Sequence, residues 1–258
     1  MLRVYEKDTP QYHFYREQHT NQTYDYVVGK AHEYSGFELI TMRSALAMMD
    51  QFVDPSDPDV SSANSIHAYQ TAERIRKAHP DNTELQICGL IHDLGKVLFS
   101  FGEPSWAVVG DTYAVGCEFP KSIVYYETMS ENPDIKHPVY STKYGVYEHG
   151  CGIERLKLSF GHDEYLYNIL QHNKCGLSSK YQKIIRFHSF YPWHTGGDYG
   201  HFECETDEQL KKDVLEFNKY DLYSKEDTDF ALTDDIRKYY DDLLSIYFPE
   251  PLRWLCRG

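Results

Sequence analysis

Histidine and aspartate side chains occupy positions that the helical pattern of this sequence assigns to the buried side. Leu210, Val214 and Phe217 mark an apolar stripe on one predicted helix, and the next position on that stripe is Asp221. A carboxylate that faces a protein core is costly unless it is paired or binds a metal ion. Other predicted helices carry an inward histidine or aspartate in the same way. The complete set is His67, His92, Asp93, His162, His188 and Asp221.

This set predicts a site for two metal ions. Six nitrogen and oxygen donors are more than one tetrahedral zinc ion requires, and facing helices are a known place for two-metal sites built from histidine and carboxylate ligands. His92 and Asp93 are adjacent, so their side chains diverge by about 100° on a helix. Asp93 could therefore bridge to a second ion while His92 binds the first. Donors without sulfur leave iron, manganese and zinc open.

Each position also has a simpler explanation. A single histidine on an apolar face is most often a hydrogen-bonded core residue, and Asp221 could pair with an arginine or lysine. The His-Asp dipeptide occurs at 92–93 and again at 162–163, and about one such pair is expected by chance. The convergence of the whole set, rather than any one member, favours the metal site.

The helices that must position these residues predict an all-α domain. We expect Thr83 and Gln86 to form a capping box, residues 54–59 and 193–199 to be loops, and residues 102–147 to be a loop-rich insertion with strand-like pieces such as 106–109. The predicted helices are 40–53, 64–80, 83–99, 161–171, 179–191, 206–223 and 234–247.

Composition excludes several classes of protein. The 258 residues include 26 lysines and arginines and 40 aspartates and glutamates, for a net charge of −14, which disfavours nucleic acid as a partner. Aromatic residues make up 15% of the chain, so disorder is not expected. The sequence has no apolar run that could span a membrane, residues 1–8 lack a signal core, and the six cysteines form no C-x-x-C pair. We expect a single cytoplasmic domain, 1–258, with reduced thiols, and a monomer.

The order His67, His92-Asp93 and Asp221 resembles the pattern of the HD-domain superfamily, which points to metal-dependent phosphohydrolases. Longer strings are more specific and resemble the myo-inositol oxygenase family over about residues 22–247. The strings that carry this resemblance are 54–59, 67–73, 92–96, 106–112, 161–167, 186–199 and 217–223.

The resemblance implies an HD-domain-like helical bundle with a loop-rich insertion and minor β pieces. It implies a di-iron oxygenase that cleaves the ring of myo-inositol with O2 to give D-glucuronate and water, the first step of inositol catabolism, with a mixed-valent Fe(II)/Fe(III) pair and no NAD, flavin or haem. By matching positions, one iron would bind His67, His92 and Asp221, the other His162 and His188, and Asp93 would bridge them. Asp163 and His194 are then not ligands.

The resemblance also implies the substrate contacts. Lys96 follows His92 by one helical turn, so we expect its ammonium to act in catalysis beside Asp93, at the edge of the metal site. Residues 1–21 match the family loosely; we expect Arg3 to close over the substrate, with Arg16 as the alternative. The implied contacts are Arg3, Asp54, Pro55, Ser56, Asp57, Lys96, Gly110, Asp111, Ser189 and Lys225.

Two other functions stay open at this point. A phosphohydrolase of the HD superfamily would use a metal-activated water and should have a basic pocket, which few basic residues near the predicted ligands could form. A scaffold without catalytic activity would normally lack some ligands, whereas this sequence has all six.

Overall fold

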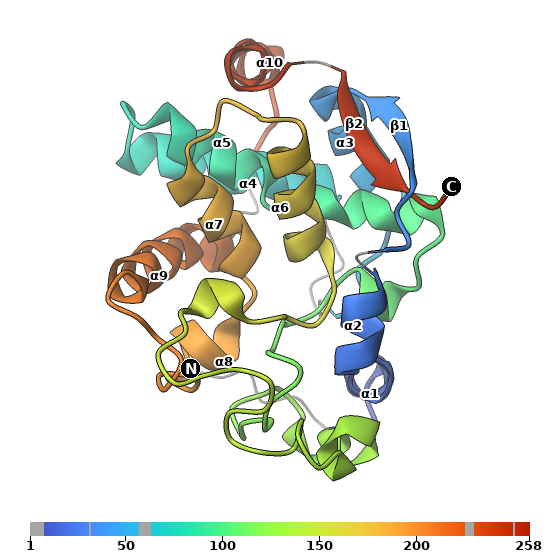
Figure 1. Cartoon of the computed structure of the whole chain (residues 1–258). Helices are drawn as coiled ribbons and strands as arrows, with labels where there is room; N and C mark the ends of the chain where they lie inside the picture. The colour runs from blue at the N-terminus through green and yellow to red at the C-terminus, as the bar shows by residue number, and fades with distance from the viewer. Residues whose placement is uncertain (1–7, 31, 57–62, 225–229, 250) are drawn as a thin grey trace.

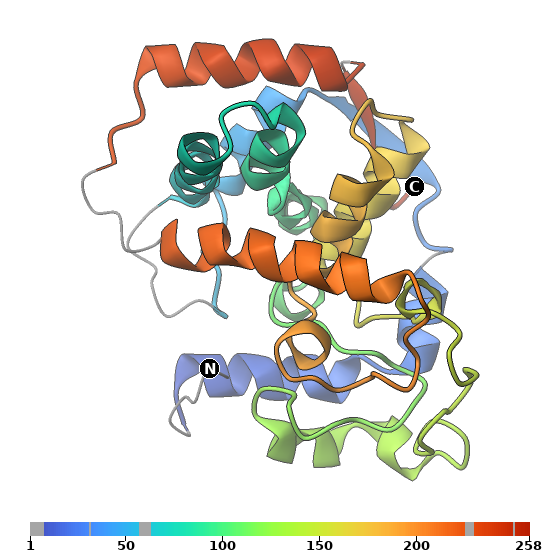
Figure 2. The ribbon, with the colours of Figure 1, turned by 90° about the vertical axis from the view of Figure 1, so that its left-hand side faces the viewer.

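Helices α4, α5, α6 and α7 form the centre of the structure, and α9 lies across them (Figures 1 and 2). The computed structural model describes residues 8–30, 32–56, 63–224, 230–249 and 251–258. Helix α10 packs against α5 on the side away from α1 and α2. The longer helices are α1 (Pro10–Asn21), α4 (Asn64–Ala78), α5 (Thr83–Ile91), α6 (His162–His172), α7 (Ser179–Phe187), α9 (Asp207–Ser224) and α10 (Asp234–Tyr247).

Shorter elements complete the described chain. Strands β1 and β2 form an antiparallel pair in which Gly36 lies opposite Cys256 and Ile40 opposite Leu252. The 3₁₀ helices η2, η3 and η4 lie in the predicted loop-rich insertion 102–147, where η2 and η3 pack against α1, and η5 follows it. These elements are α2 (Tyr24–Lys30), β1 (Gly36–Ile40), α3 (Met42–Met49), η1 (Leu94–Phe101), η2 (Ser105–Ala107), η3 (Tyr126–Glu131), η4 (Pro133–Lys136), η5 (Ile153–Arg155), α8 (Tyr191–His194) and β2 (Leu252–Cys256).

The prediction of an all-α fold with a loop-rich insertion and minor β pieces is confirmed. Helix α10 has the predicted bounds, and α6 and α9 each begin one residue later than predicted. The prediction that 106–109 is strand-like is wrong, because the residues after Pro104 form the 3₁₀ helix η2. Within the described residues, no helix is long and apolar enough to cross a membrane.

The predicted helix 83–99 is wrong at its second half. Helix α5 ends at Ile91, and the chain continues through His92 and Asp93 into η1. At Gly95, a Cβ atom would lie 2.0 Å from the carbonyl oxygen of His162. The backbone of η1 thus packs directly on the start of α6, and this long-range contact accompanies the change from α to 3₁₀ geometry.

Three further local predictions need correction. The predicted helix 40–53 is shorter, because Ile40 belongs to β1 and α3 ends at Met49. The predicted helix 179–191 ends at Phe187, and a separate short helix, α8, contains Pro192 in its first turn, where proline is tolerated. The N-cap of α5 is Asn82 rather than Thr83, because the Asn82 side chain accepts a hydrogen bond from the backbone N–H of Leu85.

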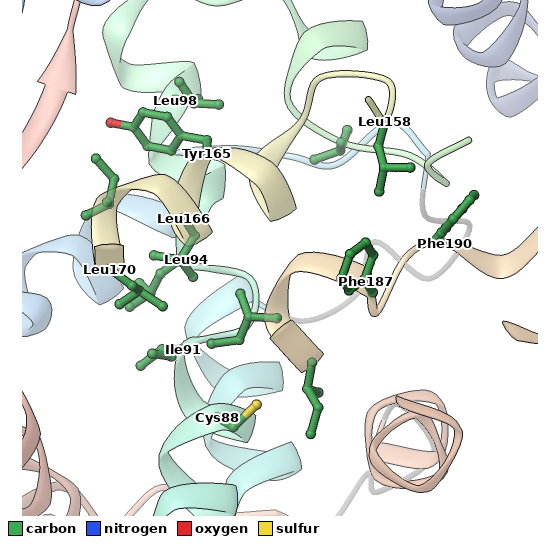
Figure 3. Close-up of a cluster of buried hydrophobic side chains, with 14 of the residues drawn as sticks. Cys88, Ile91, Leu94, Leu98, Leu158, Tyr165, Leu166, Leu170, Phe187 and Phe190 are labelled. Atoms are coloured by element: carbon green, nitrogen blue, oxygen red, sulfur yellow. The ribbon is translucent and has the colours of Figure 1, made fainter. Parts of the chain in front are cut away.

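Buried apolar residues fix the position of the His92-Asp93 pair. Figure 3 shows Cys88, Ile91, Leu94 and Leu98 facing side chains of α6 and α7, among them Leu166. Ile91 and Leu94 are fully buried on either side of the pair. Because close packing resists displacement of core residues, the core sets where these two polar side chains point.

Candidate metal centre

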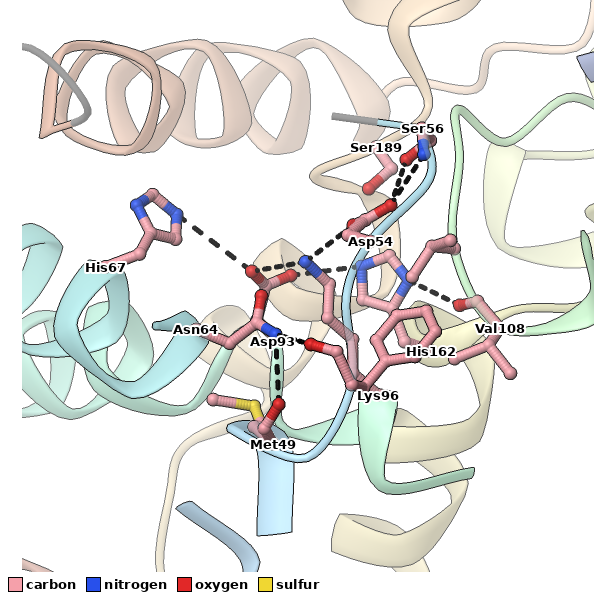
Figure 4. A network of polar contacts seen from close by, with 12 residues as sticks. Met49, Asp54, Ser56, Asn64, His67, Asp93, Lys96, Val108, His162 and Ser189 are labelled. Atoms are coloured by element: carbon pink, nitrogen blue, oxygen red, sulfur yellow. Dashed lines mark hydrogen bonds and ion pairs between the residues drawn. The ribbon is translucent and has the colours of Figure 1, made fainter. Parts of the chain in front are cut away.

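The six predicted metal ligands come together in one pocket, with an empty volume of about 520 Å³ that includes its opening to solvent. Figure 4 shows His67, His162 and Lys96 directed toward the carboxylate of Asp93. All six predicted ligands are more than nine-tenths buried. The lining residues are Tyr15, Asp54, Ser56, His67, His92, Asp93, Lys96, Gly110, Asp111, His162, His188, Ser189, Tyr191, Asp221 and Leu222.

A first group of donor atoms surrounds one oxygen of Asp221. Its Oδ1 lies 2.9 Å from Nε2 of His67 and 3.3 Å from Nε2 of His92. Oδ2 of Asp93 lies 3.6 Å from Nε2 of His92 and 3.9 Å from Nε2 of His67. Ligand atoms that bind one ion at about 2.1 Å are about 3 Å apart at right angles, so this group fits one metal ion.

A second group of donors faces the other oxygen of Asp93. Oδ1 of Asp93 lies 3.3 Å from Nε2 of His162 and 3.9 Å from Nε2 of His188, and the two imidazole nitrogens are 3.4 Å apart. Asp93 therefore presents one oxygen to each group, which is the arrangement of a bridging carboxylate.

Backbone carbonyl groups orient the imidazole rings. Nδ1 of His92 is 2.8 Å from the carbonyl oxygen of Gly89, and Nδ1 of His162 is 2.9 Å from that of Val108. A proton on Nδ1 donates to these oxygens and leaves the Nε2 lone pair facing the pocket, as a metal ligand requires.

Helix ends supply several of the donors. His92 follows the last residue of α5, His162 is the first residue of α6, and His188 follows the last residue of α7. His67 and Asp221 lie within α4 and α9. The position of a metal centre between these helices depends on how all five pack together.

Opposite charges in this pocket shift the pKa values of its groups. Burial lowers the pKa of His162, but Asp163 and Asp93 outweigh this effect and raise it to about 10. Burial raises the pKa of Asp93, but Lys96 and His92 hold it well below its usual range. A metal cation would replace the imidazole protons beside these carboxylates, so metal binding and protonation compete.

The Lys96 ammonium lies between two carboxylates. Its Nζ is 3.0 Å from Oδ2 of Asp93 and 3.0 Å from Oδ2 of Asp54. Burial lowers the pKa of Lys96, but Asp93 and Asp54 outweigh this effect and raise it above its ordinary value. Oδ1 of Asp54 accepts hydrogen bonds from the backbone N–H and hydroxyl of Ser56. Lys96 thus remains a cation and a hydrogen-bond donor beside the metal ligands.

The predicted substrate contacts are only partly placed. Asp54, Ser56, Lys96, Gly110, Asp111 and Ser189 line the pocket. Pro55 lies between Asp54 and Ser56 in the same loop, but it is not among the described residues that line the pocket. Arg3, Asp57 and Lys225 lie outside the described residues.

Sequence reasoning missed two tyrosines of the pocket. The Tyr15 hydroxyl donates to Oδ1 of Asp111 at 3.1 Å and accepts from the Asp111 backbone N–H at 3.2 Å. Tyr191 also lines the pocket. Tyr15 lies on α1, which was not among the predicted helices. Nothing in the sequence near Tyr15 therefore indicated that it contributes to the pocket around Asp93.

Fold and site together define a class of protein: a helical protein with a buried centre of histidines and carboxylates that could hold metal ions. The model of the family described as "Myo-inositol oxygenase" matches residues 9–254. The inositol oxygenase of Sus scrofa is 50% identical over 243 residues, which cover 93% of this chain and 86% of that protein. The Homo sapiens inositol oxygenase is 48% identical with 93% and 85% covered, and a probable inositol oxygenase of Oryza sativa is 45% identical with 93% and 80% covered. The chain belongs to the myo-inositol oxygenase family.

Proposed function

We propose that this protein is an inositol oxygenase that uses two iron ions and O2 to convert myo-inositol into D-glucuronate and water. The observation that carries the proposal is the Asp93 carboxylate, which directs one oxygen to each of two groups of histidine nitrogens in one buried pocket. Family membership supports the substrate and the reaction.

The donor set fits two iron ions. The first ion would bind His67, His92 and Asp221, the second His162 and His188, with Asp93 as the bridge. Imidazole and carboxylate ligands without sulfur suit iron among other metals, and the mixed-valent Fe(II)/Fe(III) state is the one that the family resemblance implies. When bound, the iron pair supplies the redox chemistry for O2 and a Lewis acid for a substrate hydroxyl.

The protein's own side chains bind and orient the polyol. Asp54, Ser56, Asp111 and Ser189 present short polar groups to the pocket, which matches a substrate with hydroxyl groups all around its ring. Lys96 holds a proton at Nζ, 3.0 Å from the bridging carboxylate, where it would stabilise negative charge on a substrate oxygen. We also propose that Arg3, Pro55, Asp57 and Lys225 assist binding, as the family resemblance implies.

The reaction balances without another cofactor. Myo-inositol gives four electrons to O2, one oxygen atom enters the product and the other leaves as water, so no NAD, flavin or haem is required. We further propose a single domain over 1–258 that acts as a cytoplasmic monomer without nucleic acid or membrane partners. The net charge of −14 supports this choice of partners.

The test is an assay of anaerobically purified, iron-loaded protein with myo-inositol and O2. We expect one D-glucuronate for each O2 consumed. Folded protein with two irons per chain that yields no glucuronate would overturn the proposal.

The phosphohydrolase alternative has little support. Lys96 is the one lysine or arginine among the described residues that line the pocket, and the relatives above are named oxygenases. Phosphate release from inositol phosphates or nucleotides, without O2 uptake, would instead favour that alternative.

A further inference from the structure

Asp163 is a buried carboxylate to which the proposed reaction assigns no role. It is the second residue of α6, directly after His162, and only 1% of its surface is exposed. A buried carboxylate is costly unless it is paired or hydrogen-bonded. The contacts of Asp163 therefore indicate which groups it stabilises.

The contacts of Asp163 connect the second metal group to a substrate-facing residue. Its Oδ1 lies 3.3 Å from Nδ1 of His188 and accepts a hydrogen bond from the Ser189 hydroxyl at 3.3 Å. The same oxygen is 2.8 Å from Nε2 of His162. Among the described residues, Oδ2 of Asp163 is buried and has no hydrogen-bond partner.

The two edges of the His188 ring have different surroundings. Nε2 faces Oδ1 of Asp93 and Nε2 of His162, as a metal ligand should. Nδ1 lies behind it, 2.8 Å from the carbonyl oxygen of Ile185 and 3.3 Å from Asp163. A carboxylate behind a metal-binding imidazole fixes its orientation and makes its other nitrogen a stronger ligand.

The first metal group shares only part of this support. Nδ1 of His92 is hydrogen-bonded to the neutral carbonyl of Gly89, as Nδ1 of His188 is to that of Ile185, but among the described residues the Asp163 carboxylate lies beside His188. The negative charge of Asp163 beside Nδ1 thus distinguishes His188 of the second group from His92 of the first. Ser189 follows His188 directly, so one carboxylate can orient a metal ligand and a substrate contact together.

We propose that Asp163 is a positioning residue for the second metal ion, acting through His188 Nδ1, and for the substrate, acting through Ser189. This proposal rests on the assignment of the two metal groups in the proposed function. When an ion takes the lone pair of His162 Nε2, that ring no longer donates to Asp163, and the carboxylate is left to His188 and Ser189.

The test compares Asp163→Asn and Asp163→Ala with Asp235→Asn as the control. Asp235 is also the second residue of its helix, α10, but it is exposed. Anaerobic Fe(II) titration by calorimetry should give two binding steps for the unaltered protein. In Asp163→Ala the second step should weaken about 10–100-fold, with the first step unchanged.

Asp163→Asn keeps an acceptor oxygen at the same place but removes the charge, so its second step should weaken less than in Asp163→Ala. Both variants should lose part of the coupled mixed-valent electron paramagnetic resonance signal and raise the KM for inositol. Asp235→Asn should match the unaltered protein in every measurement.

Three outcomes would overturn the proposal: two unchanged iron-binding steps with unchanged KM, equal weakening of both steps in Asp163→Asn, or the same change in Asp235→Asn. Should Asp163→Ala fail to fold, Asp163→Asn alone decides between these outcomes. An unaltered protein that makes no glucuronate, but whose second iron step depends on Asp163, would contradict the proposed function and leave this inference standing.

Discussion

Charged side chains of the pocket lie close enough to stabilise one another. The Lys96 ammonium is 3.0 Å from both Asp54 and Asp93, so it offsets the repulsion between these two carboxylates while it lines the pocket. A neutral side chain of similar length would keep the packing, but it would neither offset this repulsion nor place a positive charge in the pocket.

Lys96→Met should therefore lower kcat/KM by about 10²–10³-fold, the usual loss when one charge-stabilising donor is removed. The measurement is steady-state glucuronate formation, with the iron content of each preparation determined beside it. Lys238→Met, which removes an exposed lysine paired with Asp242, is the control and should leave kcat/KM unchanged. A Lys96→Met protein with two irons and full activity would show that the ammonium has no part in the reaction.

A buried histidine that belongs to neither metal group makes stability depend on pH. His19 is fully buried and burial lowers its pKa from 6.5 to about 3. Between these two values the unfolded chain binds a proton that the folded chain does not. The free energy of unfolding should therefore rise with pH across this window and gain nothing more from His19 above it.

His19→Gln should remove this contribution, so its unfolding free energy should change less steeply between pH 4.5 and 6. The difference in slope is at most about 1.4 kcal/mol per pH unit, the value for one proton. Urea unfolding of both proteins at several pH values measures it. Parallel curves would mean that folding does not lower the pKa of His19.

At the scale of elements, glycines decide how closely two segments approach. Gly95 lets η1 pack on the first residue of α6, because a Cβ atom there would lie 2.0 Å from the His162 carbonyl oxygen. Gly29, within α2, has no atom within 4 Å of the corresponding position.

Gly95→Ala and Gly29→Ala should consequently have opposite effects. Gly95→Ala should cost at least about 1–3 kcal/mol of stability through overpacking and should weaken iron binding by displacing His162. Gly29→Ala should stabilise the protein by about 0.5–1 kcal/mol, because alanine loses less entropy in a helix. Thermal and urea unfolding test both. Equal effects of the two substitutions would contradict the role of the η1–α6 contact.

The sequence was most informative where helices carry regular apolar stripes. Asp221 follows such a stripe, and α10 begins and ends where the pattern predicts. Tyr15 could not be connected with Asp111 in this way, because their hydrogen bond joins segments 96 residues apart. The end of α5 was mispredicted for the same reason: the η1–α6 contact at Gly95 is tertiary, and local periodicity does not report it.

For the whole molecule, a buried ion pair connects distant parts of the chain. The Lys30 ammonium at the end of α2 contacts both carboxylate oxygens of Glu103, at 2.9 and 2.8 Å. Glu103 also contacts Arg257, just beyond β2, at 2.9 Å. Lys30 and Glu103 are almost fully buried, so neither can turn to water when its partner is removed.

Lys30→Met should destabilise the protein by about 3 kcal/mol, because it leaves the buried Glu103 carboxylate with the half-exposed Arg257 as its cationic contact. The double variant Lys30→Met/Glu103→Leu should recover much of this loss. Urea unfolding of the two variants and the parent protein gives the comparison. A double variant no more stable than Lys30→Met would show that lost packing, rather than the missing Lys30 charge, causes the loss of stability.

The pairing of β1 with β2 has a consequence for biosynthesis. A ribosome makes Gly36 early and its partner Cys256 only after almost all of the described chain has been translated. Until then β1 lacks its partner strand, and an unpaired strand is prone to join other chains. Trp254 of β2 is also made late, and its indole N–H donates to the Ile40 carbonyl at the end of β1 at 3.1 Å. A nascent chain stalled before β2 would thus expose an open strand edge, a feature by which cellular quality control could recognise it.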